Sequence, residues 1–253
     1  MFAYRAALVR AEVAFTDRHG GTSAPPFDSL DLGDADGSDA DAAERNHTRV
    51  AVALGADPDQ VVRMRQVHGA DIALVRSEAV GGQPLGQWPV VDAVITDEPG
   101  LLLCARVADC APVLLADPQA GIVAAVHAGR SGLAAGVVSR AVDQMRAIGA
   151  ERITGWVGPR ICGFCYEVPE RLQAEVASAV PASLATTSWG TPALDIGAGV
   201  AAQLRAAGCD VVDVAQCTRE SPDLYSHRRD GPRTGRTAGY VWLPPLLQSA
   251  GTT

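Results

Sequence analysis

Lysine is absent from this 253-residue chain, and all 21 basic residues are arginines. A Walker-type phosphate loop needs a lysine, and so does an enzyme that forms a Schiff base with its substrate. Both classes are therefore excluded. If the protein binds phosphate, it must do so with arginine side chains and backbone N–H groups.

Long basic runs and long apolar runs are also missing. The net charge of −8 argues against nucleic acid as the main partner, because neutralisation of phosphates dominates that binding. A locally basic pocket is still compatible with this charge. No apolar run approaches the length that spans a bilayer. The first residues alternate apolar and polar side chains, where a signal peptide needs an unbroken apolar core. We therefore expect a cytoplasmic protein with no membrane partner.

Histidine is scarce, with five in the chain: His19, His47, His68, His127 and His227. A type 1 copper site takes two histidines and a cysteine. A four-copper laccase needs a further histidine-rich trinuclear cluster. The chain has too few histidines for both sites, which excludes a true laccase.

The six cysteines are Cys104, Cys110, Cys162, Cys165, Cys209 and Cys217. In an intracellular chain of this length we expect free thiols or metal ligands rather than a disulfide framework. Cys162 and Cys165 form a Cys-x-x-Cys motif, which is half of a structural zinc site or a redox pair. Cys209 and Cys217 have a poor spacing for the other half of a zinc site.

The order of expected elements predicts an α/β fold. Strands are expected near the N-terminus and over 61–64, 71–76, 91–96, 101–105, 112–116, 121–127, 153–157 and 210–214. Helices are expected over 41–54, 131–148, 169–180 and 195–207, with loops over 20–42 and 77–90. Because strands and helices are mixed and a hairpin is present, the pattern indicates a layered sandwich of mixed β-sheets flanked by helices. We expect residues 1–253 to form a single domain.

One expected hairpin brings two types of metal ligand together. If it turns on residues 117–120, Ala116 lies opposite Gly121 and Cys110 lies opposite His127. Directly opposed side chains are about 4.5–5.5 Å apart at Cβ, and a cysteine with a histidine suits zinc. A slip of one residue would separate them.

His68 stands at an expected strand end and is the natural third ligand. The alternative is that Cys110 is a packed residue and that each histidine is an ordinary hydrogen-bonded one.

The chain after His127 turns through Gly129-Arg130-Ser131-Gly132 into the helix expected over 131–148, with Ser131 as its N-cap. Backbone N–H groups at a helix start attract anions, so an oxyanion or phosphate beside the metal would fit. The alternative is that the glycines only make a tight turn.

Motifs along nearly the whole chain resemble the laccase-domain family of bacterial proteins. Members of this family are called polyphenol oxidases, purine nucleoside phosphorylases and peptidoglycan editing factors. In family order the matching segments are 20–23, 29–33, 65–69, 92–96, 108–113, 127–129, 158–159, 165–168, 226–231 and 234–236. They include Gln-Val-His-Gly at His68, Asp-Cys at Cys110 and His-Ala-Gly at His127.

The resemblance implies that His68, Cys110 and His127 bind one catalytic zinc, a site that copper would occupy adventitiously. It also implies a layered α/β sandwich, phosphorolysis of adenosine, inosine and methylthioadenosine, and deamination of adenosine. The expected partners are therefore a small-molecule nucleoside and phosphate, and no oligomeric state is predicted. By motif, the candidate contacts to substrate or phosphate are Arg65, Gln66, Arg228, Arg229 and Arg236.

Two other activities stay open. One is amide hydrolysis on a peptidoglycan precursor, with a zinc-bound water or Cys110 as nucleophile and His127 or His68 as base. The other, less favoured, is copper-dependent polyphenol oxidation. The zinc deaminase signature, His-x-Glu followed by Pro-Cys-x-x-Cys, is absent, so deamination would not come from that fold.

Some positions depart from the family's common pattern. Arg130-Ser131 replaces Trp-Arg, Asp31 replaces Asn, and His47 replaces Arg. The three ligands are intact, so these changes bear on substrate preference. Of the Cys-x-x-Cys motif, only Cys165 belongs to the family pattern, and we interpret Cys162 as incidental.

Overall fold

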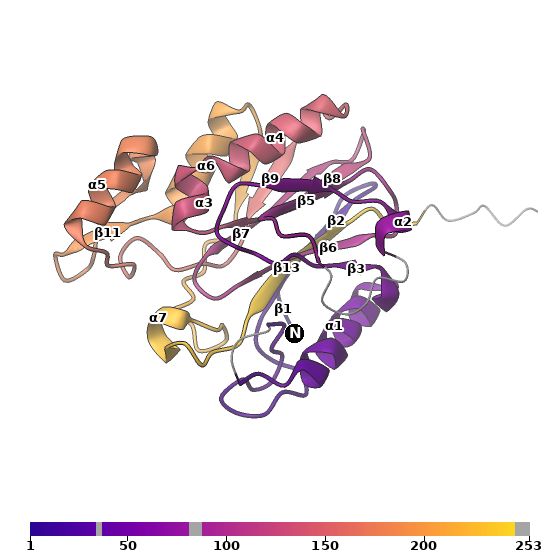
Figure 1. Cartoon of the computed structure of the whole chain (residues 1–253), viewed down its shortest axis with the longest axis horizontal. Coiled ribbons are helices and arrows are strands. Elements are labelled where there is room, and N and C mark those ends of the chain that lie inside the picture. The colour runs from indigo at the N-terminus through magenta and orange to yellow at the C-terminus, as the bar shows by residue number, and fades with distance from the viewer. Residues whose placement is uncertain (34–36, 81–87, 246–253) are drawn as a thin grey trace, which may run out of the picture.

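The computed structural model describes residues 1–33, 37–80 and 88–245. Two mixed β-sheets are stacked on each other, and helices cover the outer face of each (Figure 1). The layers therefore follow in the order helix, sheet, sheet, helix. The predicted sandwich of mixed sheets flanked by helices is confirmed.

The larger sheet has six strands in the order β12-β9-β7-β8-β5-β4. Its central strands, β7, β8 and β5, are antiparallel, and each edge adds a parallel pair. Its strands are β4 (Ile72–Leu74), β5 (Ala93–Thr96), β7 (Ala111–Asp117), β8 (Ile122–Ala128), β9 (Thr154–Val157) and β12 (Asp210–Asp213). Three helices pack on its outer face, α3 (Arg130–Ala134), α4 (Val137–Ala147) and α6 (Ile196–Ala206).

The second sheet has five strands in the order β1-β2-β13-β6-β3. They are β1 (Phe2–Ala7), β2 (Glu12–Thr16), β3 (Val61–Val62), β6 (Leu102–Val107) and β13 (Thr237–Trp242), and α1 (Ala40–Leu54) covers their outer face. Gly55 ends α1 in the left-handed conformation, φ 74°, as its position after the apolar pattern predicts.

The remaining elements are short or lie at one side. They are the 3₁₀ turns Pro58–Gln60 and Pro181–Ser183, α2 (Ser77–Val80), α5 (Glu170–Ala179), the two-stranded sheet of β10 (Leu184–Thr186) and β11 (Pro192–Leu194), and α7 (His227–Asp230). Figure 1 shows α5 and β11 at one end of the molecule and α7 beside β13.

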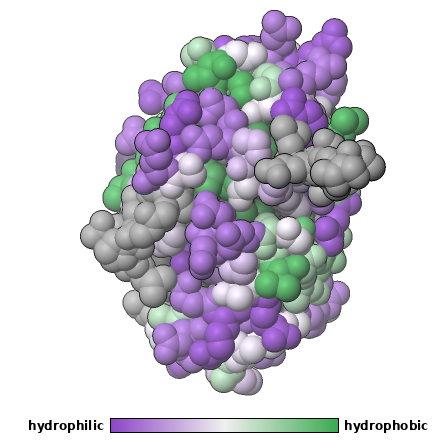
Figure 2. All heavy atoms as spheres, turned by 90° about the vertical axis from the view of Figure 1, so that its right-hand side faces the viewer, coloured by the Kyte–Doolittle hydropathy of each residue, from purple (hydrophilic) through white to green (hydrophobic). Residues whose placement is uncertain are grey.

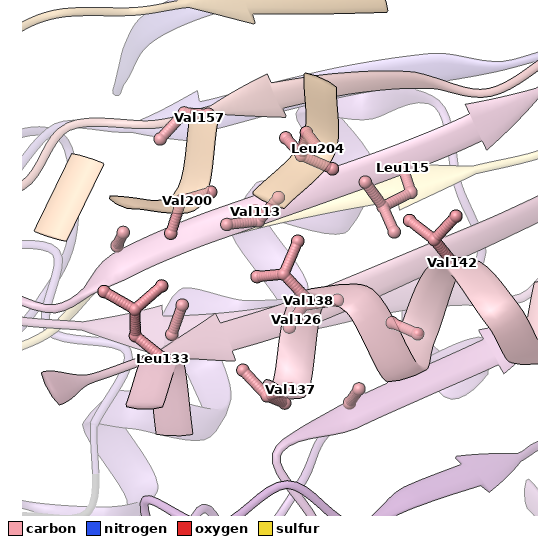
Figure 3. Packing of buried hydrophobic residues seen from close by; sticks show 14 of the residues in the cluster. Val113, Leu115, Val126, Leu133, Val137, Val138, Val142, Val157, Val200 and Leu204 are labelled. Carbon is pink, nitrogen blue, oxygen red and sulfur yellow. The ribbon is translucent and has the colours of Figure 1, made fainter. Parts of the chain in front are cut away.

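Alternate residues of the central strands belong to different hydrophobic layers. On β7, Val113 and Leu115 pack toward α4 and α6 (Figure 3), whereas Leu114 and Ala116 pack between the two sheets. All seven residues of β7 are buried. This explains why the strand is a continuous apolar run in the sequence and not an alternating one.

Three predicted elements differ in detail. The N-terminal strand is a hairpin of β1 and β2, joined by an exposed turn at Val9. The helix expected over 131–148 breaks into α3 and α4, because Gly136 adopts φ 78° between them. The predicted loop over 77–90 begins with α2, and its residues 81–87 lie outside the described part of the chain.

The strand β13 was not predicted. Its partners are β2 and β6, which lie far away in the sequence, so no hairpin turn next to it predicts the strand. All of its residues are buried. It is central to the second sheet, although it follows a polar, arginine-rich segment.

Polar residues predominate on the face shown in Figure 2, and the hydrophobic ones are scattered over it. Scattered apolar side chains are ordinary on a protein surface. Of the helices described, none has the length and apolar character needed to cross a membrane.

Candidate metal centre and its cavity

The side chains of His68, Cys110 and His127, the ligand triad, converge at one end of the layer between the sheets. Their ligand atoms all lie within 4.8 Å of one another. Cys110 Sγ is 3.8 Å from His68 Nε2, and the two imidazole rings are 4.8 Å apart between centroids. Two imidazoles and a thiolate are the donors of a zinc centre that keeps its fourth position open, so this donor set fits that metal.

The hairpin that carries two of these residues has a different register from the predicted one. Ala116 lies opposite Val123, not Gly121, and Pro112 lies opposite His127. Cys110 therefore stands two residues before the partner of His127. A shift of two keeps a side chain on the same face of the sheet, whereas a shift of one would not. The predicted convergence survives for that reason.

Asp92 organises the centre, and we did not assign it a role from the sequence. Its carboxylate accepts a hydrogen bond from His127 Nδ1 at 2.8 Å. It also accepts bonds from the backbone N–H groups of Val67, His68 and Gly69, at 3.2, 3.0 and 2.6 Å. One buried carboxylate thus fixes the ring of His127 and the loop that carries His68. Only its place in a motif pointed to it.

The backbone is strained at one triad residue and at the residue before another. Among the described residues other than glycine, His68 and Asp109 are the ones with positive φ, 60° and 91°. Ser131 Oγ donates to the carbonyl oxygen of His68 at 2.9 Å, which helps to hold that conformation. Strain of this kind collects at functional sites, where the surroundings over-determine the backbone.

Glycines bring the helix start close to the ligands. A Cβ on Gly129 would lie 2.7 Å from His68 Cδ2 and 3.2 Å from Cys110 Sγ. A Cβ on Gly132 would lie 2.9 Å from the carbonyl oxygen of Gly69. The predicted Ser131 N-cap is wrong, because the N-cap is Gly129 and α3 has only five residues. These glycines therefore serve close packing around the triad.

The electrostatics of the triad favour a thiolate. Burial raises the pKa of Cys110, but His127 and His68 outweigh this effect and lower the pKa to about 6. Burial lowers the pKa of His127, but the Cys110 charge and the Asp92 hydrogen bond raise it to about 9. Without a metal, the centre at neutral pH is therefore a thiolate–imidazolium pair. A divalent cation that replaces the His127 proton would meet ligands already in place.

A cavity of about 470 Å³ opens above the triad. Its lining includes five arginines: Arg65, Arg106, Arg130, Arg228 and Arg236. Tyr166 also lines it, and the Arg228 guanidinium lies 5.0 Å from the centre of the Tyr166 ring. A chain with net charge −8 thus gathers cationic side chains in one place.

Four of the five residues predicted to contact substrate line this cavity, namely Arg65, Gln66, Arg228 and Arg236. The amide of Gln66 exchanges two hydrogen bonds with the backbone of Arg106, at 2.8 and 2.9 Å, so it braces the wall. Arg229 is not among the lining residues. Its guanidinium donates to the carbonyl oxygens of Thr218, Ser221 and Leu224, at 2.9, 2.6 and 2.7 Å. Sequence reasoning did not single out Arg106 or Tyr166.

Asp109 connects Cys110 to the C-terminal loop. Its side chain accepts hydrogen bonds from Thr218 Oγ1, Ser226 Oγ and the backbone N–H of Arg228, at 2.6, 2.7 and 2.6 Å. Its carbonyl oxygen accepts a bond from Ile161 N–H at 3.0 Å. Three segments distant in sequence therefore hold the residue next to the thiolate.

The departures from the family pattern have local partners. Asp31 is fully buried and accepts bonds from Ser38 Oγ, Gly33 N–H and Arg236 N–H, at 2.6, 2.8 and 2.8 Å. His47 joins α1 to β13, with its ring nitrogens near Leu32 O and Tyr240 Oη. Burial and the charges of Arg63 and Arg106 lower its pKa, which keeps it neutral. Neither lies among the cavity-lining residues, whereas Arg130 and Ser131 do.

Known proteins resemble this chain over most of its length. A family model described as "Multi-copper polyphenol oxidoreductase laccase" matches residues 12–244. A purine nucleoside phosphorylase of Streptomyces coelicolor is 54% identical over 250 residues, which cover 96% of this chain and 100% of the relative. One of Mycobacterium tuberculosis is 46% identical over 241 residues, which cover 93% of each.

Among solved structures, YlmD from Geobacillus stearothermophilus matches with a TM-score of 0.86 and 34% identity, over 93% of each chain. The Bacillus licheniformis protein YfiH matches with a TM-score of 0.83 and 28% identity, over 92% of each. The motifs, the layered fold and these relatives lead to one assignment. The chain belongs to the laccase-domain family, whose model carries the polyphenol oxidoreductase description.

Proposed function

We propose that this protein is a zinc-dependent purine nucleoside phosphorylase that acts on adenosine, inosine and methylthioadenosine. The observation that carries the proposal is that the ligand triad and five arginines line the same cavity. The relatives named above carry the name purine nucleoside phosphorylase, which supports it. A cavity of about 470 Å³ lies in the size range of small-molecule sites.

The reaction breaks the glycosidic bond between ribose C1′ and the purine nitrogen, and it forms a bond from C1′ to a phosphate oxygen. The purine leaves with the bonding electron pair and takes up a proton. Zinc would be held by His68, Cys110 and His127, where it supplies a Lewis acid for an oxygen of phosphate or water. Deamination of adenosine, the second activity that we propose, would replace the amino group at C6 with oxygen from water and release ammonia.

The arginines bind and orient phosphate in this scheme. A guanidinium can donate two parallel hydrogen bonds to a phosphate, and the interaction is stronger because both groups are charged. Arg106, Arg228 and Arg236 also donate to backbone oxygens, which fixes their position in the cavity wall. Arg130 and Arg228 both lie near Tyr166, so a phosphate bound by them would lie near that phenol. Burial and the nearby Cys110 raise the pKa of Tyr166, which therefore stays protonated and can donate to ribose or purine.

The copper oxidase alternative gains no support from the other histidines. His19 pairs with Asp223 at 2.8 Å, and His47 binds Leu32 and Tyr240 inside the second sheet's outer layer. Of these three histidines, His227 is the one that lines the cavity. In the described residues, these three imidazoles do not approach one another as a trinuclear copper site requires.

The test measures turnover of each of the three nucleosides by the purified protein, with and without phosphate. The bound metal of the same protein is also measured. We expect free purine and the sugar 1-phosphate only when phosphate is present, and one zinc lost in Cys110→Ala together with the activity. Cys209→Ser is the matched control, because Cys209 packs in the hydrophobic core and belongs to no group of candidate metal ligands in the described part of the chain. Nucleoside turnover at the same rate with and without phosphate would contradict the proposal. Stoichiometric zinc without nucleoside turnover would favour the peptidoglycan-precursor amidohydrolase.

A further inference from the structure

Three cysteines and a glutamate form a second cluster beside the cavity. The ligand atoms of Cys162, Cys165, Cys217 and Glu220, the cysteine cluster, all lie within 4.8 Å of one another. Cys162 and Cys165 come from the turn after β9, and Cys217 and Glu220 from the loop after β12. The interpretation of Cys162 as incidental did not foresee this, because the missing half of the site is a Cys-x-x-Glu segment.

We propose that the cysteine cluster is a second, structural zinc site. Three thiolates and a carboxylate give four ligands, the number that closes a tetrahedral structural site. With Zn–S bonds of about 2.3 Å, the ligand atoms of such a site would be roughly 3.8 Å apart, which requires only small side-chain adjustments here. Thiolate ligands favour zinc over magnesium or calcium.

Hydrogen bonds join the members of the cysteine cluster to one another. The N–H of Cys162 points to the sulfur of Cys217 at 3.4 Å, and the Cys165 thiol lies 3.4 Å from Glu220 Oε1. The N–H of Cys165 donates to the carbonyl oxygen of Cys162 at 3.0 Å, which closes the Cys-x-x-Cys turn. A Cβ on Gly163 would lie 2.9 Å from Asp195 Cβ, so the turn packs where no larger residue fits.

Two other roles for these thiols fit less well. A reactive nucleophile needs a partly exposed thiol beside a cationic group, whereas Cys165 is buried and the cluster around it consists of two thiols and a carboxylate. A disulfide would use two of the cysteines and leave the third and Glu220 without a role. All four cluster members take part in a four-ligand site.

The position of the cluster suggests what the metal does. Cys162 follows Ile161, whose N–H holds the Asp109 carbonyl, and Cys217 precedes Thr218, whose hydroxyl holds the Asp109 carboxylate. A metal at the cluster would tie these two donors together. It would therefore stabilise the φ of 91° at Asp109 and the direction of Cys110, without touching substrate.

Metal content tests the site directly. The full chain, produced with zinc in the medium, is expected to hold two zinc ions per chain by mass spectrometry of the native protein. Cys110→Ala should lose one and Cys217→Ser the other, while Cys209→Ser keeps both. In Cys110→Ala, any remaining zinc can be assigned to the cysteine cluster. The failure of this proposal is therefore distinguishable from the failure of the proposed catalytic site.

Cobalt substitution identifies the ligands. In the Cys110→Ala background, the cobalt–thiolate absorption should correspond to three thiolates and should fall by a third in Cys162→Ser. If Cys217→Ser does not fold, Glu220→Gln serves instead, and it should weaken cluster zinc at least ten-fold against a chelator. Zinc bound at the triad should also weaken about ten-fold in either variant.

Two outcomes would overturn the proposal. One is a single zinc per chain with a disulfide among Cys162, Cys165 and Cys217. The other is a single zinc with all three thiols free to alkylation in the folded protein.

Discussion

In the candidate metal centre, Asp92 holds the imidazole ring of His127 and the loop that carries His68. In Asp92→Asn we expect zinc at the triad to bind 10–100-fold more weakly, as for other carboxylates that orient a metal-bound histidine. Competition with a chelator measures the affinity. Asp143→Asn, on the exposed side of α4, is the control and should leave it unchanged. Equal affinities in both variants would contradict the role given to Asp92.

Metal binding at the triad should release a proton near neutral pH. The pKa of His127 is raised to about 9, so its ring is protonated at pH 7.5, and it must lose that proton to bind zinc. The pKa of Cys110 is lowered to about 6, so its thiol has already lost its own. We expect affinity to rise with pH up to about 9 and to fall more steeply below about 6.

Calorimetry in two buffers of different ionisation enthalpy measures this release. About one proton per zinc is expected at pH 7.5. Heats that do not depend on the buffer would show that the thiolate–imidazolium pair is absent. Cys217→Ser protein removes the contribution of the cysteine cluster from the measurement.

Arg130 stands where the family commonly has tryptophan, and it lines the cavity beside Tyr166. Loss of a charge-assisted hydrogen bond costs about 1.5–3 kcal/mol, which corresponds to roughly 10–100-fold. Arg130→Ala should therefore raise KM for phosphate by about that factor and leave zinc content unchanged. Initial rates at varied phosphate check this. Arg140→Ala, on α4 and away from the cavity, is the matched control.

Glycines at the junctions of elements have two different roles, which substitutions can separate. Gly129→Ala places a methyl group 2.7 Å from the His68 ring, so the variant should fold but lose zinc from the triad. Gly136→Ala meets nothing within 4 Å, and it should cost only about 1 kcal/mol for its φ of 78°. Metal analysis and urea unfolding distinguish the two. If Gly129→Ala keeps its triad zinc, the methyl group does not displace the His68 ring and the prediction is wrong.

The predictable parts of the structure are those with local signals. The helix ended by Gly55 and the strands of the β7–β8 hairpin follow from apolar patterns and turn residues. The placement of Cys110 and His127 on one face was predictable too, since the error in register was an even number of residues. His68 was a candidate from its place at an expected strand end, and the resemblance strengthened that choice, for which spacing gave no argument.

The parts that escaped prediction depend on contacts between distant segments. Asp92 acts on backbone N–H groups of the loop at 67–69, which no side-chain pattern reports. Cys217 and Glu220 approach Cys162 only because β12 lies parallel to β9 and sets both following loops at one edge. The same is true of β13, whose strand partners come from far earlier in the chain.

At the level of the sandwich, stability should depend on the layer between the sheets. Leu114 is fully buried in that layer and faces Gly239 of β13. Leu114→Ala should lower the free energy of unfolding by about 2–5 kcal/mol, because it removes buried methyl groups and leaves a cavity. Chemical denaturation measures it. Leu184→Ala, on an exposed position of β10, should cost far less.

The strands β7 and β8 are packed on both faces, and the triad residues Cys110 and His127 lie where β7 begins and β8 ends. Backbone amides in such strands exchange with solvent only when the protein unfolds as a unit. The neighbouring loop at 217–226, which the structure describes in full, contains no helix or strand, and it is held by hydrogen bonds to Asp109 and Arg229 and by the buried side chain of Tyr225. Hydrogen exchange should therefore change abruptly between Ala111 and Asp109. Substrate entry and product release would then require movement of the loop at 217–226, while β7 and β8 stay in place.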